Sequence, residues 1–187
     1  MEKAIGRIIS EEVLLGDPFF SVLKRRIQTS HGDERDQLIW DRRDKSFSVA
    51  LAKDKENNFI LIKEPKYGQF KSFLTTPILT IKENETPLES AQRALYVEAG
   101  YKAEKWILLR KNAVVDFPDK IAGGDHYFFL ALDAYKVAKP KFDSELVLIP
   151  SENAAILLFS DYNGQTLDLA MSIVALALGL SFLKNSS

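Results

Sequence analysis

Apolar segments of strand length, separated by polar turn segments, dominate most of this chain. Residues 47–51 alternate between larger apolar and small side chains, and the polar segment DKENN at 54–58 predicts a hairpin turn before the apolar run FILIK. Apolar runs of strand length recur at 106–109 and 127–132. These segments predict a protein built mainly from strands that are joined by turns.

One segment, ETPLESAQRALYVEAGY at residues 85–101, carries helix signals at both of its ends. Thr86 is a good N-cap, Pro87 suits the first helical position, and Glu89 completes a capping box with Thr86. Gly100 follows the last helical residue, where a left-handed backbone favours glycine. These signals predict a helix of about three turns between Thr86 and Gly100.

Two neighbouring stripes run along this predicted helix. One stripe is apolar at helical spacing and is expected to pack on a core: Leu88, Ala91 and Leu95. The other stripe lies beside it and could present several groups to a single ligand: Arg93, Ala94, Val97 and Glu98. The helix is therefore the first candidate for a functional site.

A second long apolar segment, LDLAMSIVALALGLSFL, spans residues 167–183. Its length is at the lower edge of a membrane span, which needs about 20 residues. It lacks aromatic belts and clustered basic residues at its ends, where only Lys184 is close. Because the preceding chain has the pattern of a complete globular domain, we expect a helix that is buried in the core or in a subunit interface.

Composition narrows the class of protein. With 187 residues and 46% hydrophobic content, the chain can bury a sizeable single core. Its 25 basic and 26 acidic residues give a net charge of −1, so no overall field favours nucleic acid or a membrane surface. The absence of cysteine excludes disulfides and thiolate metal sites. The N-terminal sequence has no long apolar run typical of a signal peptide, so we expect a cytoplasmic protein.

The helix segment resembles the signature of the Nudix hydrolases. That signature is a glycine, five residues, a glutamate, seven residues, and then Arg-Glu-aliphatic-any-Glu-Glu-any-Gly-aliphatic. Four of its positions are matched by Glu85, Arg93, Glu98 and Gly100. Three are not matched, because the first glycine and two glutamates are replaced by Leu79, Ala94 and Val97. The order of the flanking segments, including HYFFLALDA at 126–134, resembles the ADP-ribose pyrophosphatase branch.

The resemblance implies the Nudix fold, an α+β fold of the α/β/α sandwich type. In this fold a mixed β-sheet is flanked by helices, and in this branch it is extended by N-terminal strands. Residues 1–45 are then expected to be N-terminal strands that form a dimerisation region. Residues 46–187 are expected to form the Nudix-like domain, in a single folding unit with the N-terminal region. A homodimer is expected on this ground.

The resemblance also implies a damaged metal site. In the family, glutamates at the positions of Ala94, Val97 and Glu98 hold magnesium or manganese against a substrate diphosphate. These hard cations need several oxygen ligands, which alanine and valine cannot supply. Glu98 is then the remaining metal ligand, and Glu145 in an acidic loop is the candidate general base. Hydrolysis of a phosphoanhydride relies on these ions, so we expect a loss of orders of magnitude in rate.

Several candidate residues also have purely structural interpretations. Glu85 and Arg93 fit either groups that organise an active site or an ion pair that supports the helix, and we favour the ion pair. Glu98 fits a solvated acid equally well, whereas Glu145, a lone acid in a lysine-bearing loop, is more typical of a solvated charge. His126, beside a glycine pair, fits the first residue of a strand. Four basic residues fit either a phosphate pocket or ordinary solvated surface: Arg42, Lys63, Lys66 and Lys71.

Two hypotheses of function follow. The first is a catalytically impaired Nudix-fold protein that needs no metal and binds a partner or a nucleotide-like small molecule through the former active site. The second is a divergent magnesium- or manganese-dependent hydrolase of nucleoside diphosphate derivatives such as ADP-ribose. Its replacement ligands would come from Glu83, Glu89 or Glu145. We favour the first hypothesis, because three departures from the signature point the same way.

Overall fold

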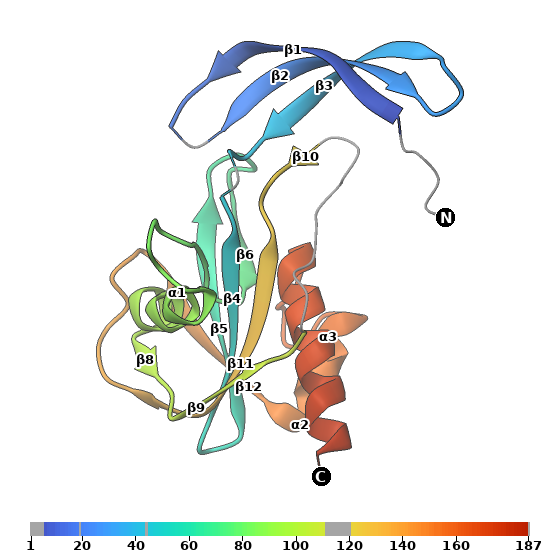
Figure 1. Cartoon of the computed structure of the whole chain (residues 1–187). Coiled ribbons are helices and arrows are strands. Elements are labelled where there is room, and N and C mark those ends of the chain that lie inside the picture. Colours follow the sequence, from blue (N-terminus) through green and yellow to red (C-terminus); the bar gives the residue numbers. More distant parts are fainter. Residues whose placement is uncertain (1–5, 19, 44, 111–120, 187) are drawn as a thin grey trace. The chain divides into compact units, whose positions relative to one another are not determined.

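The computed structural model describes residues 6–18, 20–43, 45–110 and 121–186 (Figure 1). The described residues form two compact units. The smaller unit contains residues up to 46 together with 121–125, and the larger unit contains residues 47–110 together with 126–186.

The smaller unit is a four-stranded sheet with the strand order β1-β2-β3-β10. Its strands are β1 (Gly6–Gly16), β2 (Ser21–Thr29), β3 (Glu34–Asp41) and β10 (Ile121–Ala122). The first three strands are antiparallel, and β10 runs parallel to β3. Leu23 and Ile39 are partners across β2 and β3 and are buried, whereas Leu38 and Trp40 are exposed. Alternation thus places apolar side chains on both faces of this sheet.

The larger unit is built on an eight-stranded mixed sheet with the central order β12-β5-β4-β11-β8. Three further strands complete this sheet: β6 pairs with β5, β7 pairs with β4, and β9 pairs with β11. The strands are β4 (Phe47–Asp54), β5 (Asn58–Lys66), β6 (Lys71–Thr75), β7 (Ile78–Thr80), β8 (Tyr101–Lys102), β9 (Lys105–Leu108), β11 (His126–Lys136) and β12 (Glu145–Pro150). The neighbours β4 and β11 are parallel, and the other pairs are antiparallel. The predicted turn at 54–58 joins β4 to β5, with Asn57 in a left-handed conformation at φ 70.

Helices lie on both faces of this sheet. They are α1 (Pro87–Ala94), which continues into the π-helical turn η1 (Leu95–Ala99), the short α2 (Ser151–Ala154) and η2 (Ala155–Leu158), and α3 (Ala170–Asn185). Figure 1 shows α1 and α3 on opposite sides of β4 and β11. The expected α+β architecture, a mixed sheet flanked by helices with additional N-terminal strands, is confirmed.

Strand alternation divides the interior of the larger unit into two cores. Ala50 and Ala52 of β4 pack in a buried cluster with Ala91 and Leu95, under α1 and η1. Leu51 points to the opposite face, because successive strand residues alternate. There it meets α3 so closely that a Cβ atom at Gly179 would collide with the Leu51 side chain.

The apolar segment 167–183 forms most of α3 and is a packed helix, as the sequence predicts. Its Ser172 hydroxyl is buried and lies 2.8 Å from the Thr75 hydroxyl, and it accepts the Thr76 backbone N–H at 3.0 Å. Within the part of the chain that the structure describes, no helix is long and apolar enough to cross a membrane.

The predicted apolar stripe of the first helix needs one correction. Ala91 and Leu95 are fully buried, but Leu88 is 37% exposed. The buried face of α1 consists instead of the small residues Ser90, Ala91 and Ala94. Small side chains allow the helix to pack closely on β4, and Leu88 remains at the edge of this contact.

Candidate functional site

The start of α1 is fixed by the capping box that the sequence predicts. The Glu89 backbone N–H donates to the Thr86 hydroxyl oxygen at 3.2 Å, and the Glu89 carboxylate accepts the Thr86 backbone N–H at 2.8 Å. The hydrogen bonds that the Glu89 carboxylate accepts from the Thr86 backbone N–H and hydroxyl lower the pKa of Glu89 below its ordinary value. The Glu89 carboxylate is therefore part of the N-terminal cap of α1. Using it as a replacement metal ligand would break this cap.

The other end of the helix is closed by Gly100 and by the segment 137–144. Gly100 has φ 76, and a Cβ atom there would collide with the backbone oxygen of Ala138. The Lys141 backbone N–H donates to the Val97 carbonyl at 2.8 Å, and the Ser144 hydroxyl donates to the Glu98 carbonyl at 2.7 Å. Carbonyls that a helix end leaves unpaired are thus bound by one loop.

Glu98 is buried, with 5% of its surface exposed. Its carboxylate oxygen Oε2 accepts the Ile78 backbone N–H of β7 at 2.8 Å. Burial raises the pKa of Glu98 to about 8, the Ile78 hydrogen bond opposes this, and nearby Glu64 adds to it. Lys66 and Arg93 lower the pKa of Glu98 by smaller amounts. Desolvation is the dominant effect, so the group favours its protonated form near neutral pH.

Glu64 is a member of this group of charges that the sequence analysis missed. It lies on β5 and forms an ion pair with Lys66, two residues further along the strand. Residues at this spacing share one face of a strand, and Ile62 on the same face packs in the buried cluster under α1 and η1. If the strand alternation of FILIK at 59–63 is continued to the next residue, it predicts Glu64 on the face of β5 that α1 and η1 cover.

Glu85 and Arg93 form the ion pair that the sequence analysis favours. Two guanidinium nitrogens of Arg93 donate to the two carboxylate oxygens of Glu85, each at 2.6 Å. Arg93 also donates to the Thr80 carbonyl at 2.8 Å, and Glu85 accepts the Lys82 backbone N–H at 2.9 Å. The Arg93 hydrogen bonds lower the pKa of Glu85 to about 2. This two-pronged contact ties the loop before α1 to the helix.

The positions that depart from the signature are structural. Ala94 is fully buried and Val97 is partly buried, so the stripe that would carry metal ligands is largely covered. Leu79 lies in β7, where it is the register partner of Ser48 in β4. Strand geometry needs no glycine at Leu79, and Asn84 supplies a left-handed residue in the following loop, at φ 62.

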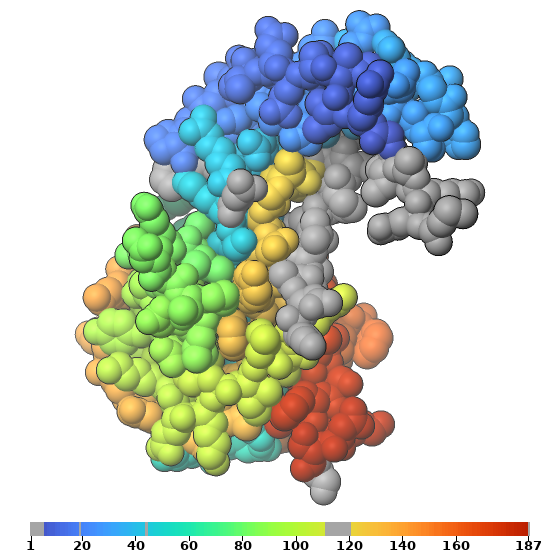
Figure 2. All heavy atoms as spheres, in the orientation of Figure 1, coloured from blue at the N-terminus to red at the C-terminus, as the bar shows by residue number. Residues whose placement is uncertain are grey.

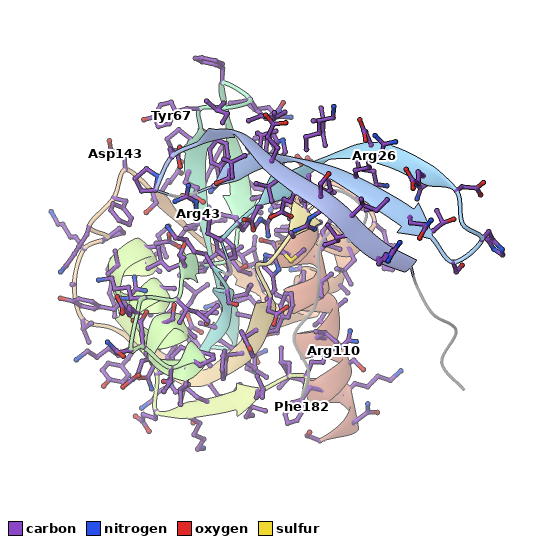
Figure 3. All side chains as sticks on the ribbon, turned by 45° about the horizontal axis from the view of Figure 1, so that its top comes forward. Arg26, Arg43, Tyr67, Arg110, Asp143 and Phe182 are labelled. Atoms are coloured by element: carbon purple, nitrogen blue, oxygen red, sulfur yellow. The ribbon has the colours of Figure 1, made fainter. Side chains whose placement is uncertain are left out.

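Glu145 is exposed at the first position of β12, opposite Lys63 of β5. It is not one of the charged groups that shift the pKa of Glu98. Figure 3 shows the preceding acidic residue, Asp143, at the outer edge of the loop before β12. Glu83, the other suggested replacement ligand, is exposed. The roles of Glu145 and Glu83 in catalysis stay predictions.

The remaining candidates have structural surroundings. His126 is buried as the first residue of β11, and its ring stacks on Phe47 with centroids 5.2 Å apart. The Lys71 ammonium lies 4.6 Å from the centre of the Phe73 ring. Lys63 and Lys66 belong to β5 of the larger unit, whereas Arg42 belongs to the smaller unit.

The donor set does not fit a magnesium or manganese ion. Among the described residues, no three histidine, aspartate or glutamate side chains lie close enough together to hold a metal. Glu98 already accepts a backbone hydrogen bond and favours its protonated form, in which it is a poor ligand. The assignment of Glu98 as a metal ligand stays a prediction.

Comparisons with known proteins establish the architecture. No family model matches the chain, and no curated protein sequence matches it. Among solved structures, the chain is similar to the crystal structure of an ADP compounds hydrolase, with a TM-score of 0.85. The sequences are 20% identical, and the match covers 100% of this chain and 98% of that chain. The chain therefore shares the fold of that hydrolase over its whole length, which confirms the Nudix fold expected from the sequence.

Proposed function

We propose that this chain is a Nudix-fold protein with impaired catalysis that acts by binding a nucleotide-like small molecule or a partner. The observation that carries the proposal is the burial of the Glu98 carboxyl group, which disfavours its ionised form. This last signature ligand is buried and hydrogen-bonded to the Ile78 backbone, beside a fully buried Ala94. Ligands of a hard cation must be ionised, and the raised pKa of the buried Glu98 means that an ion must first displace a proton from it at neutral pH.

Hydrolysis of ADP-ribose and other nucleotide sugars, with excess magnesium or manganese, tests the loss of catalysis. We expect the natural chain to turn over these substrates no faster than a Glu98→Gln variant. Metal-dependent turnover by the natural chain that disappears in Glu98→Gln would refute the proposal. An Ala94→Glu, Val97→Glu double variant serves as the restored form. Activity that appears only in this variant would identify the missing ligands as the cause.

Metal binding without turnover gives a second, independent readout. An ion that binds the folded state stabilises it in proportion to the logarithm of its concentration over Kd. We therefore expect manganese to leave the melting temperature of the natural chain unchanged and equal to that of Glu98→Gln. A rise that the Glu98→Gln substitution removes would contradict the proposal.

One observation favours the alternative, a divergent hydrolase of compounds such as ADP-ribose. Glu64 is close enough to Glu98 to raise its pKa, so two carboxyl groups share this region. Together with phosphate oxygens from a substrate, they could hold a single ion. Turnover that is lost in both Glu64→Gln and Glu98→Gln, but kept in Glu145→Gln, would support this alternative.

We further propose that the smaller unit joins two copies of this chain. Trp40 is 60% exposed, stacks on the ring of Phe20, and is the register partner of Val22, which in turn pairs with the exposed Leu15. An exposed apolar row of this kind is typical of protein interfaces. We expect a dimer in light scattering after size exclusion and a monomer in the Trp40→Glu variant. A monomeric natural chain would refute this proposal.

A further inference from the structure

The larger unit contains a cavity that the signature residues do not explain. Its volume is about 580 Å³. It is lined by Gln92 and Arg93 of α1, Tyr96 of η1, Lys102 of β8, Ala103, Trp106 of β9 and Tyr135 of β11. The volume is in the range of sites for small ligands. Figure 2 shows the segment that supplies most of this lining, residues 85–110 in green to yellow-green, at the surface of the larger unit.

This cavity lies away from the metal face of the signature. Tyr96 and Glu98 are two residues apart on a helical segment, so their side chains point to nearly opposite sides. Glu98 points to β7, where it binds the Ile78 N–H. Arg93 lines the cavity, but its guanidinium is engaged by the Glu85 carboxylate.

The strand arrangement explains why the cavity exists. Asp133 has φ 55, and the register of β11 against β4 shifts between Ala131 and Ala134. Before this irregularity β11 pairs with β9, and after it β11 pairs with β8. The link from β8 to β9 is held by two ion pairs, Lys105 to Asp133 at 2.9 Å and Lys55 to Glu104 at 2.8 Å. The lining residues of β8, β9 and β11 thus lie where β11 changes its strand partner.

Aromatic rings dominate the walls. Trp106 packs edge-on against the buried Phe129 with centroids 6.4 Å apart, which anchors the indole. Tyr96 and Trp106 are partly buried, and Tyr135 is 43% exposed. Aromatic side chains in such a setting present flat surfaces on which a planar ring can stack.

Two ammonium groups accompany these rings. Lys102 Nζ lies 5.9 Å and Lys141 Nζ lies 5.0 Å from the centre of the Tyr96 ring. In the part of the chain that the structure describes, neither lysine forms an ion pair with a carboxylate. Two uncompensated positive charges beside an aromatic wall complement a ligand that carries both a planar ring and a negative charge.

We propose that this cavity binds a planar aromatic anion of the nucleoside phosphate class. The ring stacks among Tyr96, Trp106 and Tyr135, and the phosphate lies at Lys102 and Lys141. The inference rests on the proposed binding role, but it does not depend on the loss of hydrolysis. Adenosine monophosphate is a suitable probe, because it has no phosphoanhydride bond that residual activity could cleave.

Tryptophan fluorescence gives a direct test. The chain contains 2 tryptophans, so a Trp40→Phe variant leaves Trp106 as the reporter inside the cavity. We expect adenosine monophosphate to change the Trp106 signal to saturation. Lys102→Gln should raise Kd about tenfold, since a charge-assisted hydrogen bond contributes this much. Lys136→Gln, the matched control, should leave Kd unchanged, because Lys136 is exposed and points to the opposite face of β11 from Tyr135.

Two simpler probes separate the ring from the charge. Adenosine and ribose 5-phosphate should each bind about tenfold or more weakly than adenosine monophosphate, since each lacks one of the two contacts. Adenosine that binds as tightly as the monophosphate would overturn the assignment of an anion site. No saturable signal at millimolar monophosphate, or an equal loss in Lys102→Gln and Lys136→Gln, would overturn the site itself. Hydrolysis assays on the same variants report separately on the proposed loss of catalysis.

Discussion

Replacing Glu98 with glutamine tests whether its carboxyl is a buried, protonated group. Burial raises the pKa of Glu98 from its ordinary value of 4.5 to about 8. In the unfolded chain the group ionises near 4.5, so the unfolded state releases a proton that the folded state keeps. The free energy of unfolding therefore falls as the pH rises from 4.5 to about 8, and this contribution is level above that range.

The magnitude follows from the size of this displacement. At 1.36 kcal/mol per pH unit, it corresponds to about 5 kcal/mol, which is an upper value because relaxation and water penetration reduce burial costs. We expect the natural chain to lose roughly 2–5 kcal/mol more stability than Glu98→Gln between about pH 5 and about pH 8.5. Glutamine keeps the shape and an oxygen acceptor for the Ile78 N–H, but it cannot ionise.

Urea unfolding of both proteins at the two pH values is the measurement. Glu145→Gln is the matched control, because it removes the same charge from an exposed position and should follow the natural chain. Curves for Glu98→Gln and the natural chain that stay parallel, within about 0.5 kcal/mol, would show that Glu98 is ionised in the fold. Burial would then not suppress the ionisation of Glu98, and the main support for impaired catalysis would be lost.

Three further predictions concern contacts that hold α1 and α3 in the larger unit. Glu85→Gln should cost about 2–3 kcal/mol near neutral pH by urea unfolding, and the difference should vanish as the pH falls from 4.5 towards 2, because the ion pair to Arg93 is lost in this range. Gly100→Ala should lower stability by at least about 2 kcal/mol, since φ is 76 and the added Cβ meets backbone; a loss below about 0.5 kcal/mol would contradict the left-handed geometry. Gly179→Ala should cost about 1–3 kcal/mol in thermal unfolding, because the fully buried Leu51 must move, and an unchanged melting temperature would refute this close contact.

Local sequence patterns were enough to predict the hairpin and both ends of the first helix. The N-cap at Thr86, the capping partner Glu89 and the left-handed Gly100 depend on neighbours within one turn, and the structure places all three as predicted. The hairpin at 54–58 is similarly local. The π-helical turn from Leu95 to Ala99 was not predicted, because the hydrophobic spacing of five residues does not distinguish it from an α-helix.

The surroundings of the other site residues depend on contacts between segments that are far apart in the sequence. The sequence suggests equal weights for a solvated and a metal-binding Glu98, but the side chain is buried against β7, twenty residues earlier in the chain. Its neighbour Glu64 comes from another strand, and the cavity beside Tyr96 depends on an irregularity at Asp133. Such contacts join segments that no local pattern connects, so only the fold reveals them.

The segment 137–144 binds the carbonyls at the end of the helix, and this has a consequence for how the protein opens. The backbone amides of Val137, Ala138 and Lys141 all donate to carbonyls of Val97 or Gly100. Their hydrogens cannot exchange with solvent until the helix end separates from the loop. In hydrogen exchange these loop amides should therefore be as slow as those of η1, so that a segment with the sequence of a surface loop belongs to the same cooperative unit as the helix.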